Sequence, residues 1–137
     1  WGGIKETAPI TLNDTEVRVT TNLLAALQRL SQKPRGTYFW IDALCINQRS
    51  TEEKNYQVPL MRNIYQQAEC VLMWLGKEAD NSHLAMSMIE TWAAVLENIK
   101  DSFNKPSWTA MRYFFERPYW RRIWIVQEVV LSRHAVL

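Results

Sequence analysis

Glu128 stands inside an apolar stretch, and its carboxylate is the strongest candidate for chemistry in this sequence. The stretch runs over residues 123–131 and is interrupted only by Gln127 and Glu128. An ionised carboxylate among apolar side chains is costly unless it is paired or hydrogen-bonded. Two interpretations follow: Glu128 pairs with a nearby arginine, or it is the working group of a site. The residues alone favour the pairing, since structural ion pairs also perturb carboxylates.

Three arginines lead into this stretch and are interleaved with aromatic side chains. Arg117, Arg121 and Arg122 lie close to Trp124 and to other aromatic residues of the same segment. Guanidinium groups beside stacking aromatics can bind a phosphate-bearing ligand. The alternative, which the residues favour, is arginine packing on aromatic faces at the surface.

A second polar group follows a short aromatic and β-branched run at residues 38–41, which reads as a buried strand. Asp42 comes directly after this run, and Asn47 and Gln48 follow within the next loop. Open α/β sheets place ligand sites at the carboxyl ends of buried strands. Asp and Asn also bond their own backbone in turns. A ligand site and plain turn chemistry both stay open here.

The remaining reactive residue types argue against a metal or a common nucleotide fold. His83 and His134 are isolated, and Cys45 and Cys70 have no metal-ligand spacing. Both cysteines sit in apolar runs, so we expect buried free thiols in a reducing compartment. The four glycines form neither a dinucleotide fingerprint nor a phosphate loop. We therefore predict no metal site and no cofactor.

Composition bounds the class of protein. The 137 residues match one ordinary domain, and 47% hydrophobic residues with seven tryptophans supply a large aromatic core. A net charge of +2 gives no argument for nucleic acid. No apolar run reaches the length of a membrane span. The sequence opens at Trp1 without Met and closes on a strand-like 135–137, so we expect a single domain, 1–137, cut from a longer chain.

Periodicity and turn signals predict the elements that must position these side chains. They are a β-hairpin over 10–19 around an Asn13-Asp14 turn with room for one or two more loop residues; a helix over 23–30 capped by Thr21 or Asn22; a strand at 38–41; a loop at 49–55 with a capping signal, Ser50 three residues before Glu53; a helix from Gln57 or Val58 to Ala68, since Pro59 is tolerable only in the first turn; a strand at 70–75; a helix over 81–99 with Leu84, Met88 and Trp92 on its inner face; a loop at 101–106; and a helix over 108–115. The unit 38–75 predicts a parallel strand pair with a right-handed crossover.

The stretch around Glu128 is ambiguous by propensity. Five β-branched residues in nine favour a strand over 123–131, whereas a buried helix fits equally well by length. A helix would place Arg121, Trp124 and Glu128 on one face.

With these residues set out, the sequence resembles the heterokaryon incompatibility (HET) domain of filamentous fungi. The longest matching block is Trp-Ile-Asp-Ala-Leu-Cys-Ile-Asn-Gln over 40–48. The other matching blocks are Trp1-Gly2, Asn22-Leu23 with Leu27, Gln57-Val58 with Met61, Ile64-Tyr65 and Ala68, Trp74-Leu75-Gly76, and the run from Arg117 to Trp120 continuing through Arg122-Ile123-Trp124 to Gln127-Glu128. The resemblance spans essentially the whole chain. The family pattern also begins with a strand of which only Trp1-Gly2 remains here, so we expect the first strand to be absent.

The resemblance implies a function in non-self recognition between fungal strains, ending in programmed cell death. Members often sit within larger receptor chains, so the expected partners are neighbouring domains and further copies of the chain, in the cytoplasm. The family is distantly similar to TIR domains, some of which hydrolyse NAD. That similarity implies a three-layer, TIR-like (flavodoxin-like) parallel sheet flanked by helices, with a small N-terminal hairpin, and makes residues 122–131 a helix.

The same similarity assigns roles to the polar residues. Trp124 and Glu128 keep the W-x-x-x-E spacing of the TIR catalytic helix, with Ile125 where many TIR domains carry Cys. Glu128 is then the catalytic candidate, with NAD as substrate. Residues Asp42, Asn47 and Gln48 would line the pocket mouth, and Arg121 or Arg122 would meet the pyrophosphate. The alternative is a non-enzymatic signalling module that acts by self-assembly or partner binding.

Overall fold

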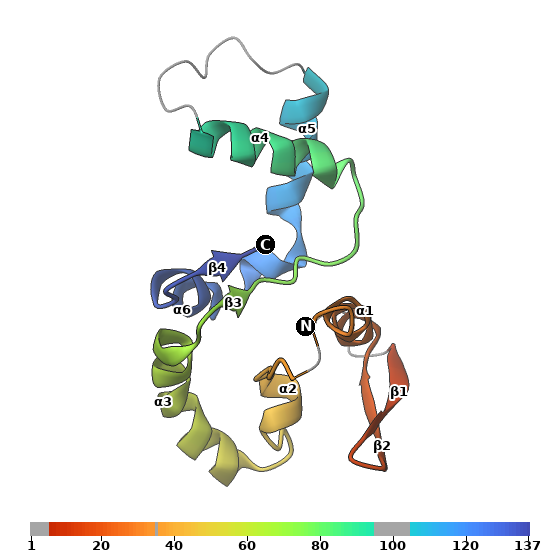
Figure 1. The fold of residues 1–137 in the computed structure, drawn as a ribbon, viewed down its shortest axis with the longest axis vertical. Helices are drawn as coiled ribbons and strands as arrows, with labels where there is room; N and C mark the ends of the chain where they lie inside the picture. Colours follow the sequence, from red (N-terminus) through yellow and green to blue (C-terminus); the bar gives the residue numbers. More distant parts are fainter. Residues whose placement is uncertain (1–5, 35, 95–104) are drawn as a thin grey trace.

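The computed structural model describes residues 6–34, 36–94 and 105–137, and within them the chain is a mixed α/β structure, as the sequence predicts. In chain order the elements are β1 (Thr7–Leu12), β2 (Thr15–Thr20), α1 (Thr21–Leu30), α2 (Asp42–Cys45), α3 (Thr51–Gln67), β3 (Val71–Leu72), α4 (Ser82–Ala94), α5 (Lys105–Glu116), the 3-10 helix η1 (Pro118–Arg121), α6 (Ile125–Val130) and β4 (Ala135–Val136). Figure 1 shows β3, β4 and α6 in the middle, between the α4–α5 pair and the N-terminal half.

The N-terminal hairpin is confirmed, with a tighter loop than predicted. Leu12 pairs with Thr15, so only Asn13 and Asp14 remain in the loop. Their φ angles are 48° and 62°, the left-handed conformation that a type I′ turn needs at both positions. Asn and Asp tolerate this conformation better than other non-glycine residues, which explains why this pair closes the hairpin.

Helix α1 directly follows the hairpin. Its cap is Thr20, whose hydroxyl accepts a 3.2 Å hydrogen bond from the N–H of Leu23, rather than the predicted Thr21 or Asn22. Ala25 and Ala26 are its buried residues, while the leucines that set its periodicity are half-buried.

The predicted strand at 38–41 is wrong. These residues form no strand, and the side chain of Tyr38 is 97% exposed. Strand β3 pairs in parallel with β4 instead: the N–H of Val71 donates to the carbonyl of His134 at 2.8 Å, and that of Met73 to Val136 at 2.7 Å. Aromatic and β-branched residues favour strands only where a neighbouring strand and a packed face receive them. Residues 38–41 have neither, so the predicted parallel pair within 38–75 does not form.

Helix α3 begins earlier than predicted. Ser50 caps it by accepting a 3.1 Å hydrogen bond from the N–H of Glu53, so the capping signal is confirmed. The helix continues from Thr51 through Pro59 to Gln67, and the expected loop over 51–55 is therefore helical. An interior proline costs about 3 kcal/mol through its missing donor and its steric clash. Burial of Met61, two residues later, helps to offset that cost.

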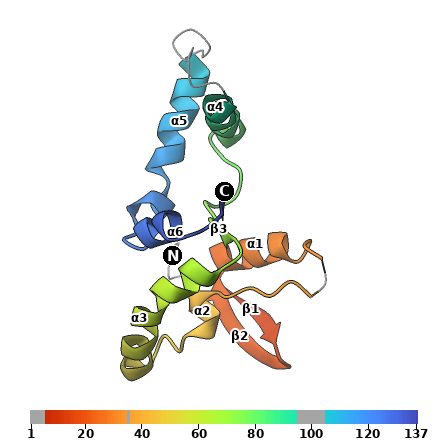
Figure 2. The same cartoon turned by 60° about the vertical axis from the view of Figure 1, so that its left-hand side comes forward.

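The larger hydrophobic core lies between α4 and α5, which pack side by side at one end of the molecule (Figure 2). Its buried members are Ala85, Met88, Ala110, Met111 and Phe114. The predicted inner face of the first helix is confirmed within 82–94. The predicted continuation to residue 99 and the loop over 101–104 lie outside the described residues, and residues 105 and 106 belong to α5.

A second, smaller core joins β3 to η1 and brings the region of Glu128 together. Its buried members are Val71, Met73 and Tyr119. The described residues hold two two-stranded sheets, β1–β2 and β3–β4. They do not form the three-layer, TIR-like parallel sheet that the resemblance implies.

Both cysteines are free, as predicted, but they are exposed rather than buried. Cys45 ends α2, a single turn that buries none of its residues. Cys70 lies in the connection between α3 and β3. None of the described helices combines the length and the apolarity that crossing a membrane requires.

Candidate functional site

The stretch around Glu128 is helical, which decides between the two structures left open by propensity. The carbonyl of Trp124 accepts hydrogen bonds from the N–H groups of Gln127 (2.9 Å) and Glu128 (3.0 Å). Trp124 therefore precedes Glu128 by one helical turn, and both lie on the same side of the turn. The helix itself, α6, covers only Ile125–Val130 and is shorter than the 122–131 that the resemblance implies.

The carboxylate of Glu128 points inward and is bound on both oxygens. Glu128 is 7% exposed and is the only buried polar or charged residue in the described part of the chain. The phenol of Tyr119 donates a hydrogen bond to Oε2. The Nη1 of Arg122 lies 3.3 Å from Oε1, as a hydrogen bond and an ion pair. The expected pairing of this buried carboxylate with an arginine is therefore confirmed.

Tyr119 is the most enclosed part of the site, with 1% of its surface exposed. The guanidinium of Arg122 lies over its ring, 5.7 Å from the ring centre. Burial raises the pKa of Tyr119 well above its usual 10.0, and the hydrogen bond to Glu128 and the negative charge of that carboxylate raise it further. The phenol therefore stays protonated and remains a donor.

Tyr65 on α3 completes the group, which we call the Glu128 cluster: Tyr65, Tyr119, Arg122 and Glu128. Burial raises the pKa of Tyr65, followed by the negative charges of Glu128 and Asp42. Helices α3 and α6 contact each other, so the cluster draws on α3, η1 and α6. It also lies within the electrostatic reach of Asp42, which connects it to the second predicted polar group.

The polar residues after 38–41 mostly serve local turns. Asp42 accepts a 2.7 Å hydrogen bond from the N–H of Ala43 through Oδ1, and its carbonyl accepts from the side chain of Gln48 at 2.9 Å. Asn47 Oδ1 accepts from the N–H of Arg49 at 3.1 Å. Asn47 and Gln48 are exposed, and Asp42 is half-buried. Local turns therefore account for these bonds. Of the three residues, Asp42 is the one whose charge acts on the Glu128 cluster, through the pKa of Tyr65.

The chain bends between η1 and α6, which separates the two neighbouring arginines. Arg122 has extended backbone angles (φ −84°, ψ 135°), so Arg121 belongs to η1 and not to the helix of Glu128. The predicted shared face of Arg121, Trp124 and Glu128 is wrong for Arg121, which is exposed. Arg122, rather than Arg121, reaches the carboxylate.

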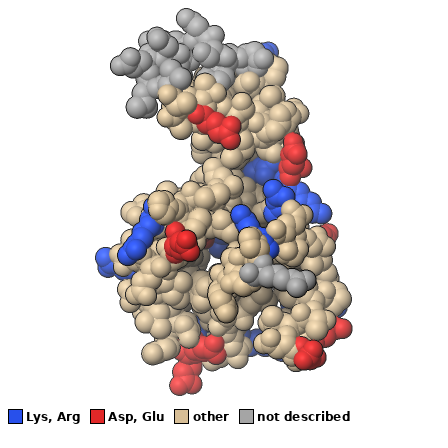
Figure 3. All heavy atoms as spheres, in the orientation of Figure 1, with Lys and Arg blue, Asp and Glu red and all other residues tan. Residues whose placement is uncertain are grey.

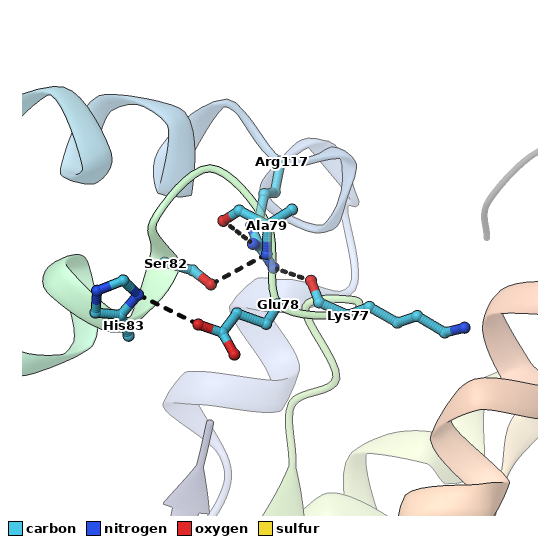
Figure 4. Close-up of polar contacts among 6 residues, drawn as sticks. All are labelled: Lys77, Glu78, Ala79, Ser82, His83 and Arg117. Atoms are coloured by element: carbon cyan, nitrogen blue, oxygen red, sulfur yellow. Dashed lines mark hydrogen bonds and ion pairs between the residues drawn. The ribbon is translucent and has the colours of Figure 1, made fainter.

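Arg117 has a structural role away from this cluster. Its guanidinium donates to the carbonyls of Leu75 and Lys77, both at 3.3 Å, and of Ala79 at 3.1 Å. Figure 4 shows the side chain of Arg117 reaching the loop that leads from β3 to α4, beside the contact of Glu78 with His83. The arginine thereby ties the start of η1 to this loop.

Sequence reasoning missed two members of the cluster, Tyr65 and Tyr119. The sequence places Tyr65 at helical spacing with apolar residues and Tyr119 among the aromatic residues beside the arginines, and neither position indicates a hydrogen-bond donor. A usable signal was present: a buried tyrosine hydroxyl needs a partner, and so does a buried carboxylate. Matching these two needs would have paired Tyr119 with Glu128.

Other features of the described residues point to no competing site. No group of three or more His, Cys, Asp or Glu side chains in the described ranges could hold a metal ion. A hollow lies between residues 80–81, just before α4, and helix α5, and it includes none of the cluster; its lining residues are Asp80, Asn81, Lys105, Pro106, Thr109, Ala110 and Tyr113. On the face in Figure 3, acidic and basic atoms form small separate groups.

Comparison with known proteins places this arrangement in context. Residues 1–128 match the family described as Heterokaryon incompatibility protein (HET). Heterokaryon incompatibility protein 6, OR allele, from Neurospora crassa is 31% identical over 125 residues. That match covers 81% of this chain but only 18% of the relative. No solved structure matches the chain.

Proposed function

This chain belongs to the heterokaryon incompatibility (HET) family, and we propose that it acts in fungal non-self recognition as the domain that triggers programmed cell death. The Neurospora crassa relative carries heterokaryon incompatibility in its name. Because the match covers 18% of that relative, we further propose that other domains of a larger chain supply recognition. We also propose that the domain works in the cytoplasm.

We propose Glu128 as the working group, in TIR-like cleavage of NAD. The observation that supports this is an enclosed carboxylate, one turn after Trp124, whose neighbours include two tyrosines with raised pKa values. Enclosed charges with perturbed neighbours are typical of functional sites. Each carboxylate oxygen can accept two hydrogen bonds. Tyr119, Arg122 and the hydrogen bond that Tyr65 shares with Glu128 leave the carboxylate capacity for a ribose hydroxyl.

In the proposed reaction the bond between ribose C1′ and the nicotinamide nitrogen breaks. Its electron pair leaves with nicotinamide, and water adds at C1′ with loss of a proton. The negative charge of Glu128 stabilises the oxocarbenium-like transition state. Asp42, Asn47 and Gln48 would line the approach of NAD to Glu128. Arg122 is engaged with Glu128, so Arg121 is the arginine proposed for the pyrophosphate.

The test is nicotinamide release by the full natural chain, mixed with NAD at high protein concentration. Wild type should release nicotinamide, and Glu128→Gln should not, while Glu90→Gln on the exposed side of α4 should match wild type. Absence of release from folded wild type, together with undiminished killing by Glu128→Gln in fungal cells, overturns the proposed chemistry.

A second candidate function is a non-enzymatic module that kills by self-assembly, and the enclosure of Glu128 favours it. The carboxylate of Glu128 is already bound by Tyr119 and Arg122. The outer face of α6, in contrast, is apolar and exposed. Val126 is 64% exposed and Val130 is 71% exposed, and they lie one turn apart. Exposed apolar patches of this kind mark interaction sites.

The two candidates predict opposite mutant phenotypes. Under self-assembly, the double substitution Val126→Lys with Val130→Lys abolishes killing and reduces assembly size by sedimentation, whereas Glu128→Gln keeps both if the protein folds. Under NAD cleavage, Glu128→Gln abolishes killing with assembly unchanged. Circular dichroism on each variant separates these effects from misfolding.

A further inference from the structure

We propose that Tyr119 is the positioning residue for Glu128: its phenol fixes the direction of the carboxylate. This inference rests on the proposed cleavage of NAD by Glu128. Tyr119 would not touch substrate and would act only through the carboxylate that it binds.

The ring of Tyr119 is held from several sides, so its hydroxyl has a fixed location. The ring packs with Val71 and Met73 in the smaller core. It meets Trp120 edge to face, with ring centres 5.2 Å apart, and Arg122 covers it. Only rotation about the bond to the hydroxyl oxygen remains. Forming the hydrogen bond to Glu128 therefore costs little additional conformational entropy.

Glu128 itself has weak local support. Its helix, α6, has six residues, and helices of this length are marginal without tertiary contacts. Val126 and Val130 on the outer face are exposed, so the packing that holds α6 comes from its inner side. The hydrogen bond from Tyr119, the contact from Arg122 and the hydrogen bond with Tyr65 are polar contacts on that side. Of these partners, Tyr119 is the most deeply buried, so the direction of the carboxylate depends chiefly on its phenol.

The experiment is a double-mutant cycle that measures binding of a non-hydrolysable NAD analogue to the full chain by calorimetry, beside nicotinamide release. Tyr119→Phe removes the donor and keeps the ring, and it is made both in wild type and in Glu128→Gln. Tyr56→Phe, on the exposed side of α3, is the matched control. We expect Tyr119→Phe to weaken binding about threefold or more in wild type and to leave it unchanged in Glu128→Gln, with Tyr56→Phe unchanged in both.

Each outcome decides something. An equal loss of binding in wild type and in Glu128→Gln means that Tyr119 has only a packing role, which overturns the inference and leaves the cleavage standing. If Tyr119→Phe does not fold, Tyr119→Met, which also removes the donor, takes its place in the cycle. No nicotinamide release from folded wild type overturns the proposed cleavage, and this inference with it.

Discussion

The phenol of Tyr119 donates a hydrogen bond to the carboxylate of Glu128 and so joins η1 to α6 across the bend at Arg122. Arg122 contacts both members of this pair, through an ion pair with Glu128 and over the ring of Tyr119. Three side chains from one short segment therefore satisfy each other, and their removal should be felt in stability as well as in function.

Arg122→Met should lower the free energy of unfolding by about 1–3 kcal/mol, because it leaves Glu128 enclosed without its cation while Tyr119 still donates. Arg121→Met is the matched control next in sequence, and it should stay within about 0.5 kcal/mol of wild type because Arg121 is exposed. Urea denaturation followed by circular dichroism measures both. Equal losses of unfolding free energy in the two variants would contradict the different roles assigned to Arg121 and Arg122.

Stability should fall as the pH rises above about 10, because the pKa values of Tyr65 and Tyr119 are raised above their usual 10.0. The unfolded chain releases these protons first, so the contribution is fully present below pH 10 and is lost above it. Urea denaturation from pH 8 to pH 11 measures the slope. The slope should be shallower for Tyr119→Phe than for Tyr38→Phe, since Tyr38 is fully exposed; identical slopes would argue against the assigned shift.

Arg117→Lys should destabilise the protein by about 1–2 kcal/mol, because one ammonium cannot replace a guanidinium that reaches several carbonyls. Arg112→Lys is the control. Arg112 makes an exposed ion pair with Glu116 at 3.4 Å, and such pairs contribute at most about 1 kcal/mol. Thermal unfolding should rank Arg117→Lys below Arg112→Lys, and the reverse order would exclude the proposed tie to the β3–α4 loop.

Asp14→Gly should stabilise the hairpin by up to about 1 kcal/mol, because glycine adopts the left-handed conformation of this turn position without steric cost. Asp14→Val should destabilise it, since a β-branched residue is strained at a positive φ. Thermal unfolding of both variants checks the sign. A loss of stability on Asp14→Gly would mean that the aspartate side chain has a role beyond the turn.

Local signals in the sequence were sufficient for much of the secondary structure. The Asn13-Asp14 turn, the Ser50 cap and the inner face of α4 are each set by neighbouring residues, and each is confirmed. The predicted strand at 38–41 is wrong because a strand depends on a partner strand that local sequence does not reveal. The strand β3 pairs instead with β4, which lies close to the C-terminal end of the described residues. Pro59 misled the prediction for α3, because the gain from the Ser50 cap and the packing of Met61 outweighs a proline within the helix.

The candidate site was partly predictable for the same reasons. Glu128 stood out because one carboxylate interrupted an apolar run, and its structural pairing with an arginine was one of the two interpretations offered. The identity of that arginine depended on the bend after η1, which the spacing of Arg121 and Arg122 does not reveal. The charges of Asp42 and Glu128 both raise the pKa of Tyr65, and this relationship depends on a contact between α3 and α6 that sequence periodicity does not encode.

The pairing of β3 with β4 also has a consequence for the order of folding. It joins residue 71 to residue 135, and so closes a loop of roughly 60 residues whose entropy is lost for a few ladder hydrogen bonds. The β1–β2 hairpin and the α4–α5 pair involve near neighbours in sequence and should form first. During synthesis, β3 can pair with β4 only after β4 has left the ribosome. Tyr119 packs against β3, so we expect the Glu128 cluster to assemble late among the described elements.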